Sequence, residues 1–383
     1  MRRLRYLTAG ESHGRGLVGI LEGMPAGLVV QPEIINRQLA RRQRGHGRGG
    51  RMRIEQDQAE VIAGIRFGKT LGSPIALLVW NRDWQNWQRA MDPWQEPPDY
   101  QPVTVPRPGH ADLAGALKYG FSDIRNVLER ASARETTMRV ALGALPRHML
   151  AHFGIQIASH VIQLHEIRSQ ANARDFSNLS ELLSRADGSP VRCLDPQAER
   201  EMIARIDQAK AEKNTVGGVF ELLVSGLPVG LGSHVHWDRK LDARIAAAML
   251  SLQAMKGVGI GSGFEAASRW GSEAHDAIYY DEQRGFYRRE GRSGGIEGGM
   301  STGELLSVRV AMKPLSTLMQ PLDSVDIISK RPVKAHVERS DVCAVPAASI
   351  IGENLLAFTL ADALLEKYGG DSIAEIEGRF GDK

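Results

Sequence analysis

A short basic segment is the part of this chain with the most evident capacity for chemistry. Residues 41–53 read RRQRGHGRGGRMR, in which six arginines and one histidine stand among four glycines. Glycine lets the backbone approach a ligand closely, and arginine offers a planar fork that binds phosphate or carboxylate through two hydrogen bonds. The segment therefore predicts a site for a strongly anionic molecule, either a nucleic acid or a small ligand.

Two features of the chain favour the small ligand. The segment has no interleaved aromatic residues on which bases could stack, and the formal net charge of the whole chain is only +3. A nucleic-acid-binding protein stays a second hypothesis, because arginine- and glycine-rich tracts also bind phosphate backbones. A purely structural cluster is a third, although so many like charges repel one another unless an anion joins them.

Two histidines are candidates for proton transfer. His13 stands in GESHG and His110 in RPGHAD, each beside glycine and close in sequence to arginine or acidic residues. A histidine near a phosphate is held cationic and can donate a proton to a leaving oxygen. A lone histidine is more often structural, so that alternative stays open. Neither histidine belongs to a metal-binding pattern, and we expect no metal site.

Four further segments carry residues suited to anion or cofactor binding. Residues 128–140 place Arg130, Ala131, Ser132 and Arg134 at the start of an expected helix, whose free N–H groups could bind an anion or whose first turn Ser132 could cap. The other three are a glycine-dense loop at 294–304, the sequence KPLST at 313–317, and 338–348 with Arg339, Asp341 and Cys343. Without evidence of an activated thiolate, we interpret Cys343 as a packed small residue rather than a nucleophile.

The glycine pattern of nicotinamide enzymes occurs in this chain, but its context is wrong. Residues 14–19 match GxGxxG, yet the sequence continues as a strand and a turn through Met24 and Pro25. The dinucleotide fingerprint must instead open a helix after a strand. Residues 257–263 fail the same test because they follow an expected helix. We therefore reject a nicotinamide dehydrogenase.

The helices and strands that must position these residues alternate along the chain in no regular order. We expect strands before Gly10, on both sides of a turn within 17–30, within 60–68 and 73–80, and at 216–226. We expect helices at 31–42, 111–119, 133–152, 195–213, from Asp238 as its cap, and from about 346 to 367, with a long loop at 81–108. Pro146 should kink or divide its helix. This order predicts an α+β fold in one integrated domain spanning residues 1–383.

Composition is that of a soluble globular protein. The 383 residues are 42% hydrophobic and 24% charged, and no stretch approaches the run of about 20 apolar residues that a membrane span needs. The N-terminus lacks the apolar region of a secretory signal. Cys193 and Cys343 lie too far apart for a disulfide framework or a zinc pattern. We expect a cytoplasmic protein.

Taken together, the motifs resemble one known family across nearly the whole chain. GESHG, RRQRGHGRGGRM, RPGHAD, ERASARETTMRV, GGIEGGMSTGE, KPLST and RSDVCAVPAA occur in the order found in chorismate synthases. The resemblance implies a layered β-α-β sandwich that assembles as a homotetramer. It also implies anti 1,4-elimination of phosphate from 5-enolpyruvylshikimate 3-phosphate, giving chorismate, with reduced FMN and no net redox change.

The resemblance also implies roles for individual residues. The catalytic residues would be His13, His110 and Asp341. The substrate would be bound by Arg42, Arg48, Arg51, Arg107, Arg134 and Arg339. The flavin would contact Arg130, Ala131, Ser132, Gln253, Ala254, Gly298, Lys313, Pro314, Leu315, Ser316, Thr317 and Arg339.

This chain departs from the family pattern at one flavin-binding position, and the resemblance also implies how the flavin is reduced. Where the family usually has serine this chain has Ala131, so one hydrogen bond worth about 1 kcal/mol could be absent. The flavin would be reduced by an external flavin reductase, with NADPH involved only indirectly. No nucleic acid and no membrane are expected as partners.

Overall fold

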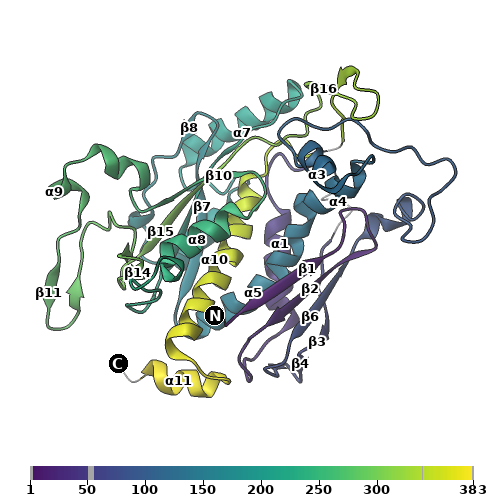
Figure 1. Cartoon of the computed structure of the whole chain (residues 1–383). Coiled ribbons are helices and arrows are strands. Elements are labelled where there is room, and N and C mark those ends of the chain that lie inside the picture. The colour runs from purple at the N-terminus through teal and green to yellow at the C-terminus, as the bar shows by residue number, and fades with distance from the viewer. Residues whose placement is uncertain (1–2, 51–55, 339, 382–383) are drawn as a thin grey trace.

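Two antiparallel β-sheets frame the protein (Figure 1). The computed structural model describes residues 3–50, 56–338 and 340–381. The first sheet has the order β1 (Arg5–Ala9), β2 (Gly16–Glu22), β6 (Ile75–Trp80), β3 (Glu60–Ala63). The second has the order β10 (Met255–Ile260), β15 (Leu306–Met312), β9 (Gly218–Ser225), β7 (Gln156–Leu164), β8 (Ile167–Arg168).

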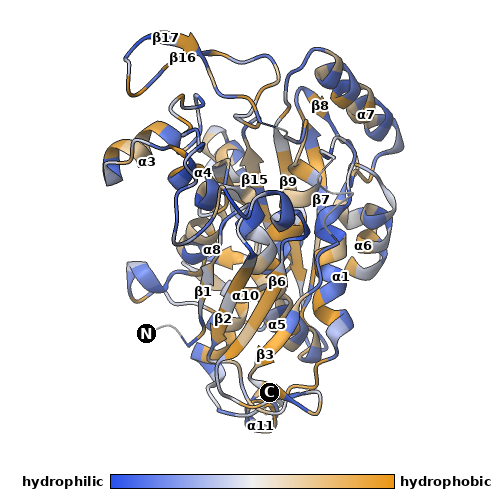
Figure 2. Ribbon diagram, turned by 90° about the vertical axis from the view of Figure 1, so that its right-hand side faces the viewer, coloured by the Kyte–Doolittle hydropathy of each residue, from blue (hydrophilic) through white to orange (hydrophobic). Residues whose placement is uncertain are grey.

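The longest helices lie between the two sheets, as Figure 1 shows. Helix α5 (Thr136–His152) packs on β2 and β6, whereas α10 (Val345–Tyr368) packs on β7 and β9, and the two helices contact each other. Helix α1 (Pro32–Gln43) contacts both of them. Figure 2 shows that α10 and the strands of both sheets are largely hydrophobic. The core therefore forms where each sheet meets its helix.

Close packing of α5 on the first sheet depends on one glycine. Strand β2 alternates buried and exposed residues, so Leu17, Gly19 and Leu21 face the helix. A Cβ atom on Gly19 would lie 2.4 Å from Met138 Cγ on α5 and 2.8 Å from Leu142 Cδ1. A larger residue at this position would therefore force the side chains of Met138 and Leu142 to shift.

Helix α10 is buried around its whole circumference. It is long and apolar enough to span a membrane by length and composition, yet the whole of its most apolar window is buried inside the protein. A helix that is apolar all round is typical of the centre of a large core. The sequence-based expectation that no apolar stretch approaches membrane-spanning length was wrong for this helix, and its burial explains why the helix is nonetheless a core element.

The remaining elements are short or peripheral. The helices are α3 (Asp112–Tyr119), α4 (Arg125–Ala131), α6 (Leu179–Gly188), α7 (Pro196–Ala211), α8 (Leu241–Leu250), α9 (Gly271–Ala274) and α11 (Ile373–Gly381). The strands form pairs, β4 (Ile65–Arg66) with β5 (Lys69–Thr70), β11 (Tyr279–Asp281) with β12 (Gly285–Tyr287), β13 (Ile296–Glu297) with β14 (Met300–Ser301), and β16 (Asp323–Val325) with β17 (Pro332–Lys334). Short 3-10 helices are η1 (Arg82–Asn86), η2 (Ala133–Glu135), η3 (Ala173–Asp175), η4 (Trp237–Arg239) and η5 (Gly263–Ser268).

The prediction of mixed α and β elements is confirmed, with several local errors. The second strand expected within 17–30 is wrong, since the chain there makes only isolated bridges through Ala26 and Val29. Pro146 does not divide α5, which runs continuously from Thr136 to His152. Asp238 does not cap α8, because it lies in η4 and Lys240 occupies the cap position.

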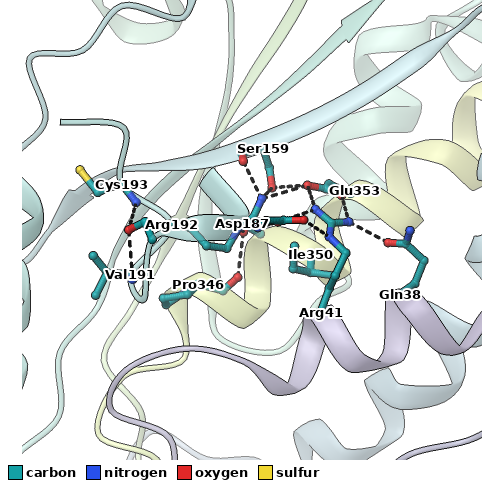
Figure 3. A network of polar contacts seen from close by, with 12 residues as sticks. Gln38, Arg41, Ser159, Asp187, Val191, Arg192, Cys193, Pro346, Ile350 and Glu353 are labelled. Carbon is teal, nitrogen blue, oxygen red and sulfur yellow. Dashed lines mark hydrogen bonds and ion pairs between the residues drawn. The ribbon is translucent and has the colours of Figure 1, made fainter. Parts of the chain in front are cut away.

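A buried ionic cluster joins α1 to α10 (Figure 3). Glu353 of α10 is fully buried and accepts hydrogen bonds from Arg41 Nη1 at 2.6 Å, Arg147 Nη1 at 2.6 Å and Arg192 Nη2 at 3.2 Å. Asp187 binds Arg41 Nε at 2.8 Å and also pairs with Arg192. Burial alone would raise the pKa of Glu353, but the three guanidinium groups lower it to about 2. Arg41, to which the sequence assigned no partner, is thus part of the core.

Candidate active site

His13 lies in the loop after β1 and is held by Glu129 of α4. The Nδ1 atom of His13 lies 2.8 Å from Glu129 Oε1, and the backbone N–H of His13 donates to Glu129 Oε2 at 2.7 Å. Trp87, from the long loop after β6, stacks on the imidazole with ring centroids 4.0 Å apart. The side chain of His13 keeps 14% of its surface exposed, so a ligand can still reach it.

Asn81 fixes the backbone of the His13 loop. Its side-chain N–H₂ donates to the carbonyl oxygens of Glu11, Ser12 and Gly14, the last at 2.7 Å. Its oxygen accepts from Arg134 Nε at 2.9 Å, so one buried amide ties this loop to the arginine. Ser132 donates to the hydroxyl of Ser12 at 3.1 Å and also caps η2, as the sequence allowed.

Two of the predicted anion-binding arginines meet beside this loop. Arg134 Nη1 lies 2.6 Å from Asp57 Oδ1, and Arg42 Nη1 lies 3.7 Å from Asp57 Oδ2, so one fully buried carboxylate serves both. Arg42 also donates to Thr136 and to the carbonyl of Ala133. Burial lowers the pKa of Arg42 to about 9, an effect that Asp57 partly offsets and that nearby Arg48 and Arg134 increase.

The guanidinium of Arg42 is buried near two other arginines, Arg48 and Arg134, as well as near carboxylates. Its Nη1 atom is buried and makes no hydrogen bond within the described part of the chain, although Asp57 lies within ion-pair distance. A buried guanidinium N–H without a hydrogen bond is costly, so an added anion would be bound favourably there. The burial of Arg41 and Arg42 also removes two of the six arginines from any surface on which a nucleic acid could bind.

The rest of the basic segment meets the chain before α10. Arg48 Nη1 lies 2.8 Å from Asp341 Oδ2, and the backbone N–H of Gly49 donates to Asp341 Oδ1 at 2.6 Å. The candidate catalytic carboxylate is therefore already paired with a candidate substrate-binding arginine. The predictions for Arg51 and Arg339 lie outside the described residues.

His110 forms a second site with its own carboxylate. Its Nδ1 atom lies 2.5 Å from Oδ1 of the buried Asp112 at the start of α3. Arg107 donates from Nε to Asp112 Oδ2 at 2.8 Å and from Nη1 to Thr317 Oγ1 at 2.9 Å, and its Nη2 lies 3.1 Å from His110 Nδ1. Burial alone would raise the pKa of Asp112, but hydrogen bonds from His110 and Arg107 hold it well below its usual range. Asp112 is thus a permanent anion beside His110.

The KPLST segment lies directly against the His110 loop. Lys313 Nζ donates to the carbonyl of Gly109 and to Ser316 Oγ, both at 2.8 Å, and Ser316 donates to the same carbonyl. Gly109 has φ +77°, and a Cβ there would lie 3.2 Å from Lys313 Nζ. Burial, with Lys256 nearby, lowers the pKa of Lys313. Within the same segment, Leu315 accepts a hydrogen bond from Thr215.

Two further flavin candidates, Arg130 and Gln253, lie around Thr8 and Glu135. The carboxylate of Glu135 accepts from Thr8 Oγ1 at 3.0 Å and from Gln253 Nε2 at 3.2 Å, and Arg130 donates to Thr8 at 2.7 Å. The backbone N–H of Lys313 donates to Ala254 at 3.0 Å, which joins this group to the KPLST segment. Ala131 ends α4 beside Ser132.

Gly298 is the candidate that no described contact joins to the others. It lies in the turn between β13 and β14 with φ +59°. Its neighbour Gly299 accepts a hydrogen bond from Leu241 of α8, so the described contacts of this turn lead to α8. The assignment of Gly298 to the flavin stays a prediction.

A chain of charges links the two histidine sites. Arg125 Nη1 lies 3.0 Å from Glu129 Oε1, and its Nη2 lies 3.9 Å from Glu338 Oε1. Glu338 Oε2 lies 3.7 Å from Arg107 Nη1, beside His110. His13 and His110 are therefore brought into one continuous polar region, although 97 positions separate them in the sequence.

Sequence reasoning missed the residues that hold the candidates in place. These are Asp57, Asn81, Trp87, Asp112, Glu129 and Glu135. A signal existed for Asp112, which follows His110 by two positions in RPGHAD, and for Glu129, which precedes Arg130 in the helix. No local signal marked Asp57 or Asn81, because their partners come from distant segments.

Cys343 is buried, as the sequence interpretation required. It has no exposed surface, and burial raises the pKa of its thiol to about 12. The nucleophilic thiolate is therefore absent at neutral pH. We expect Cys343→Ala to keep a kcat within about twofold of the native enzyme. Steady-state assays test this, and a loss of turnover without a loss of folded protein would show that the thiol takes part.

Two histidines with carboxylate partners thus lie in one polar region with buried arginines, an arrangement suited to proton transfer on an anionic ligand. The family model described as chorismate synthase matches residues 4–365. The chain therefore belongs to the chorismate synthase family, and it is a carbon–oxygen lyase.

Individual relatives agree with this assignment over almost their full length. Chorismate synthases of Symbiobacterium thermophilum and Aquifex aeolicus are 56% and 54% identical to this chain, covering 98% and 100% of it and 97% and 98% of their own length. A crystal structure described as chorismate synthase superposes with a TM-score of 0.78 at 43% identity, covering 100% of this chain and 97% of its own.

Proposed function

We propose that this protein converts 5-enolpyruvylshikimate 3-phosphate to chorismate by anti 1,4-elimination of phosphate, with reduced FMN and no net redox change. The observation that carries the proposal is the position of His13, which is held by Glu129 in a loop that Asn81 ties to Arg134. An elimination of phosphate needs this combination, because the leaving group requires both a cationic site and a proton donor.

The arginines supply the counter-charges for a substrate with one phosphate and two carboxylates. Arg42 and Arg134 both pair with Asp57, so an anion that binds beside them would meet two guanidinium groups. Arg48, Arg51, Arg107 and Arg339 complete the proposed substrate-binding set. Arg48 would exchange part of its pairing with Asp341 for the ligand.

The polar groups around Gln253 fit a flavin mononucleotide. Gln253 Oε1 is buried and accepts no hydrogen bond from the described residues, so it can accept from an N–H of the flavin ring. Arg130 and Lys313 provide positive charge for the phosphate or the reduced ring, with Ser132, Ser316 and Thr317 as hydroxyl donors. Backbone N–H groups would replace the hydroxyl that Ala131 lacks. Pro314, Leu315, Ala254 and Gly298 complete the proposed contacts.

The proposed chemistry divides the proton work between the two histidines. Reduced flavin, when bound, supplies electron density transiently and helps to remove the ring hydrogen. His13 donates a proton to the phosphate oxygen as the carbon–oxygen bond breaks. His110, held against the anionic Asp112, places positive charge or a proton beside the cofactor. Asp341, which pairs with Arg48, assists proton handling.

We also propose how the chain is organised, how it assembles and with what it interacts. Residues 1–383 act as one domain with the layered β-α-β sandwich of the family, supported by the helices packed between two sheets. Four chains assemble as a homotetramer in the cytoplasm. An external flavin reductase supplies reduced FMN, with NADPH used only indirectly, and neither nucleic acid nor membrane is a partner.

An anaerobic assay tests the proposed function. The purified protein is incubated with reduced FMN and 5-enolpyruvylshikimate 3-phosphate, and chorismate and inorganic phosphate are measured together. We expect equal amounts of both products and no consumption of reduced flavin. Absence of both products from folded protein would contradict the proposal, and so would release of phosphate without chorismate.

A further inference from the structure

Glu129 makes two hydrogen bonds to His13 and a third to the neighbouring Ser12. Its two carboxylate oxygens take one hydrogen bond from the ring and one from the backbone N–H of His13, at 2.8 and 2.7 Å. Its own carbonyl oxygen accepts from the N–H of Ser12 at 3.0 Å. A side chain that binds both the ring and the main chain of another residue restricts that residue's χ angles as well as its location. Glu129 therefore sets the orientation of the imidazole, beyond simply anchoring the loop.

The surroundings of Glu129 also hold the imidazole flat against a neighbour. Glu129 is 2% exposed, and Arg125 one helical turn earlier supplies its counter-charge at 3.0 Å. The same guanidinium lies 5.0 Å from the ring centroid of Trp87, which stacks on His13 with an interplanar angle of 27°. A buried carboxylate is costly without such partners. The four side chains thus form one unit around the imidazole.

The bond at Nδ1 has a chemical consequence. In neutral histidine one ring nitrogen carries the proton and the other accepts, and the partner of one nitrogen decides the tautomer. A carboxylate at Nδ1 favours the proton there, so exchange with a substrate takes place at Nε2.

We infer that Glu129 is a positioning residue for His13, which selects the tautomer of the imidazole and directs proton transfer to its Nε2 atom. This inference rests on the proposed role of His13 in expelling phosphate. Trp87 stacks on the imidazole and Arg125 pairs with Glu129, so both residues support the same arrangement. A similar pairing of His110 with Asp112 shows that both candidate histidines depend on a buried carboxylate.

The kinetic test is a double-mutant cycle between Glu129 and His13. We expect Glu129→Ala to lower kcat about tenfold to a hundredfold, while KM changes little, because proton transfer rather than binding is impaired. Glu129→Gln should retain more activity, since its amide oxygen can still accept from Nδ1. In a His13→Ala background, Glu129→Ala should cause almost no further loss. Equal losses in both backgrounds, or an unchanged kcat, would overturn the inference.

A matched control is offered by a second buried histidine–glutamate pair. His160 Nε2 lies 3.0 Å from Glu221 Oε2 between strands β7 and β9. Glu221→Gln removes a buried carboxylate of the same kind, and we expect kcat to stay at the native value. Thermal melting of every variant separates lost activity from lost folding. A loss of kcat in Glu221→Gln as large as that in Glu129→Gln would contradict a specific role for Glu129.

A spectroscopic measurement keeps the inference distinct from the proposed function. Solid-state NMR of ¹⁵N-histidine-labelled protein reports which ring nitrogen of His13 carries the proton, with His13→Asn used for assignment. We expect the Nδ1–H form in the native protein and a mixture in Glu129→Ala. If the native protein makes no chorismate, the proposed function fails while this result still tests positioning. An unchanged tautomer in Glu129→Ala would overturn the inference even if the enzyme is active.

Discussion

Replacing His13 by alanine should lower kcat for chorismate formation by about a hundredfold or more. The departing phosphate would lose its proton donor, while Arg42 and Arg134 would still bind the substrate, so KM should change much less. Rapid-quench measurement of phosphate release under single-turnover conditions isolates the chemical step. The size of the loss follows from removing one general acid from an otherwise intact site.

Replacing His110 by alanine should lower kcat for chorismate formation by a similar factor, and it should also change the affinity for FMN. His110 touches Asp112, Arg107 and the loop that binds Lys313, so its replacement should also weaken FMN binding, measured by flavin fluorescence. His152→Ala is a matched control, because that histidine pairs with Glu377 on the surface at the end of α5. Near-native turnover in both His13→Ala and His110→Ala would remove the roles assigned to them.

Replacing Glu353 by alanine should destabilise the fold by about 3–5 kcal/mol. Among the described residues, Asp187 is then the carboxylate that remains paired with Arg41 and Arg192, and burial already lowers the pKa of Arg147 and Arg192. Urea unfolding of the native chain and the variant measures the difference. Glu366→Ala is the control on the same helix, since Glu366 is exposed and binds Arg244 at the surface. A change below about 1 kcal/mol for Glu353→Ala would show that the cluster is not a net source of stability.

The same carboxylate gives the fold a pH dependence of known sign. Its pKa falls from the ordinary value of 4.5 to about 2 on folding, so the unfolded state binds the proton more readily. Its contribution to stability is therefore complete above pH 4.5 and is lost as the pH falls towards 2. Repeating the urea experiment through this window should show a steeper loss of stability in the native chain than in Glu353→Gln.

The elements with strong periodicity or clear end signals were predictable from sequence. Helix α7 begins with Asp195 as its cap and Pro196 in its first turn, and α1 begins with Pro32, so local chemistry defines both. Strand β7 was missed, although it lies inside the second sheet. It is buried on both faces, carries the polar Ser159 and His160 near its middle, and pairs with β9 more than 50 positions later, so it lacks the alternation that identifies a half-buried strand.

The candidate site was predictable only in part, for a related reason. Histidines and arginines in glycine-rich segments are conspicuous in a sequence, and the resemblance supplied their proposed roles. The residues that orient them are ordinary amino acids whose partners lie far away, such as Asn81 beside Arg134 and Asp57 between two arginines. Their importance depends on three-dimensional contacts that no local pattern encodes.

Arg41 and Arg42 are neighbours in the sequence, but their side chains bind in different parts of the protein. Arg41 enters the ionic cluster at Glu353, whereas Arg42 reaches Thr136 and Asp57 in the candidate site. The last turn of α1 is therefore fixed to the core through Arg41, while Arg42 extends into the candidate site. If Arg42 binds the substrate as proposed, its guanidinium is already ordered, and substrate binding need not supply the free energy to order it. By the same linkage, a bound anion at Arg42 would hold α1 against α10 and resist global unfolding.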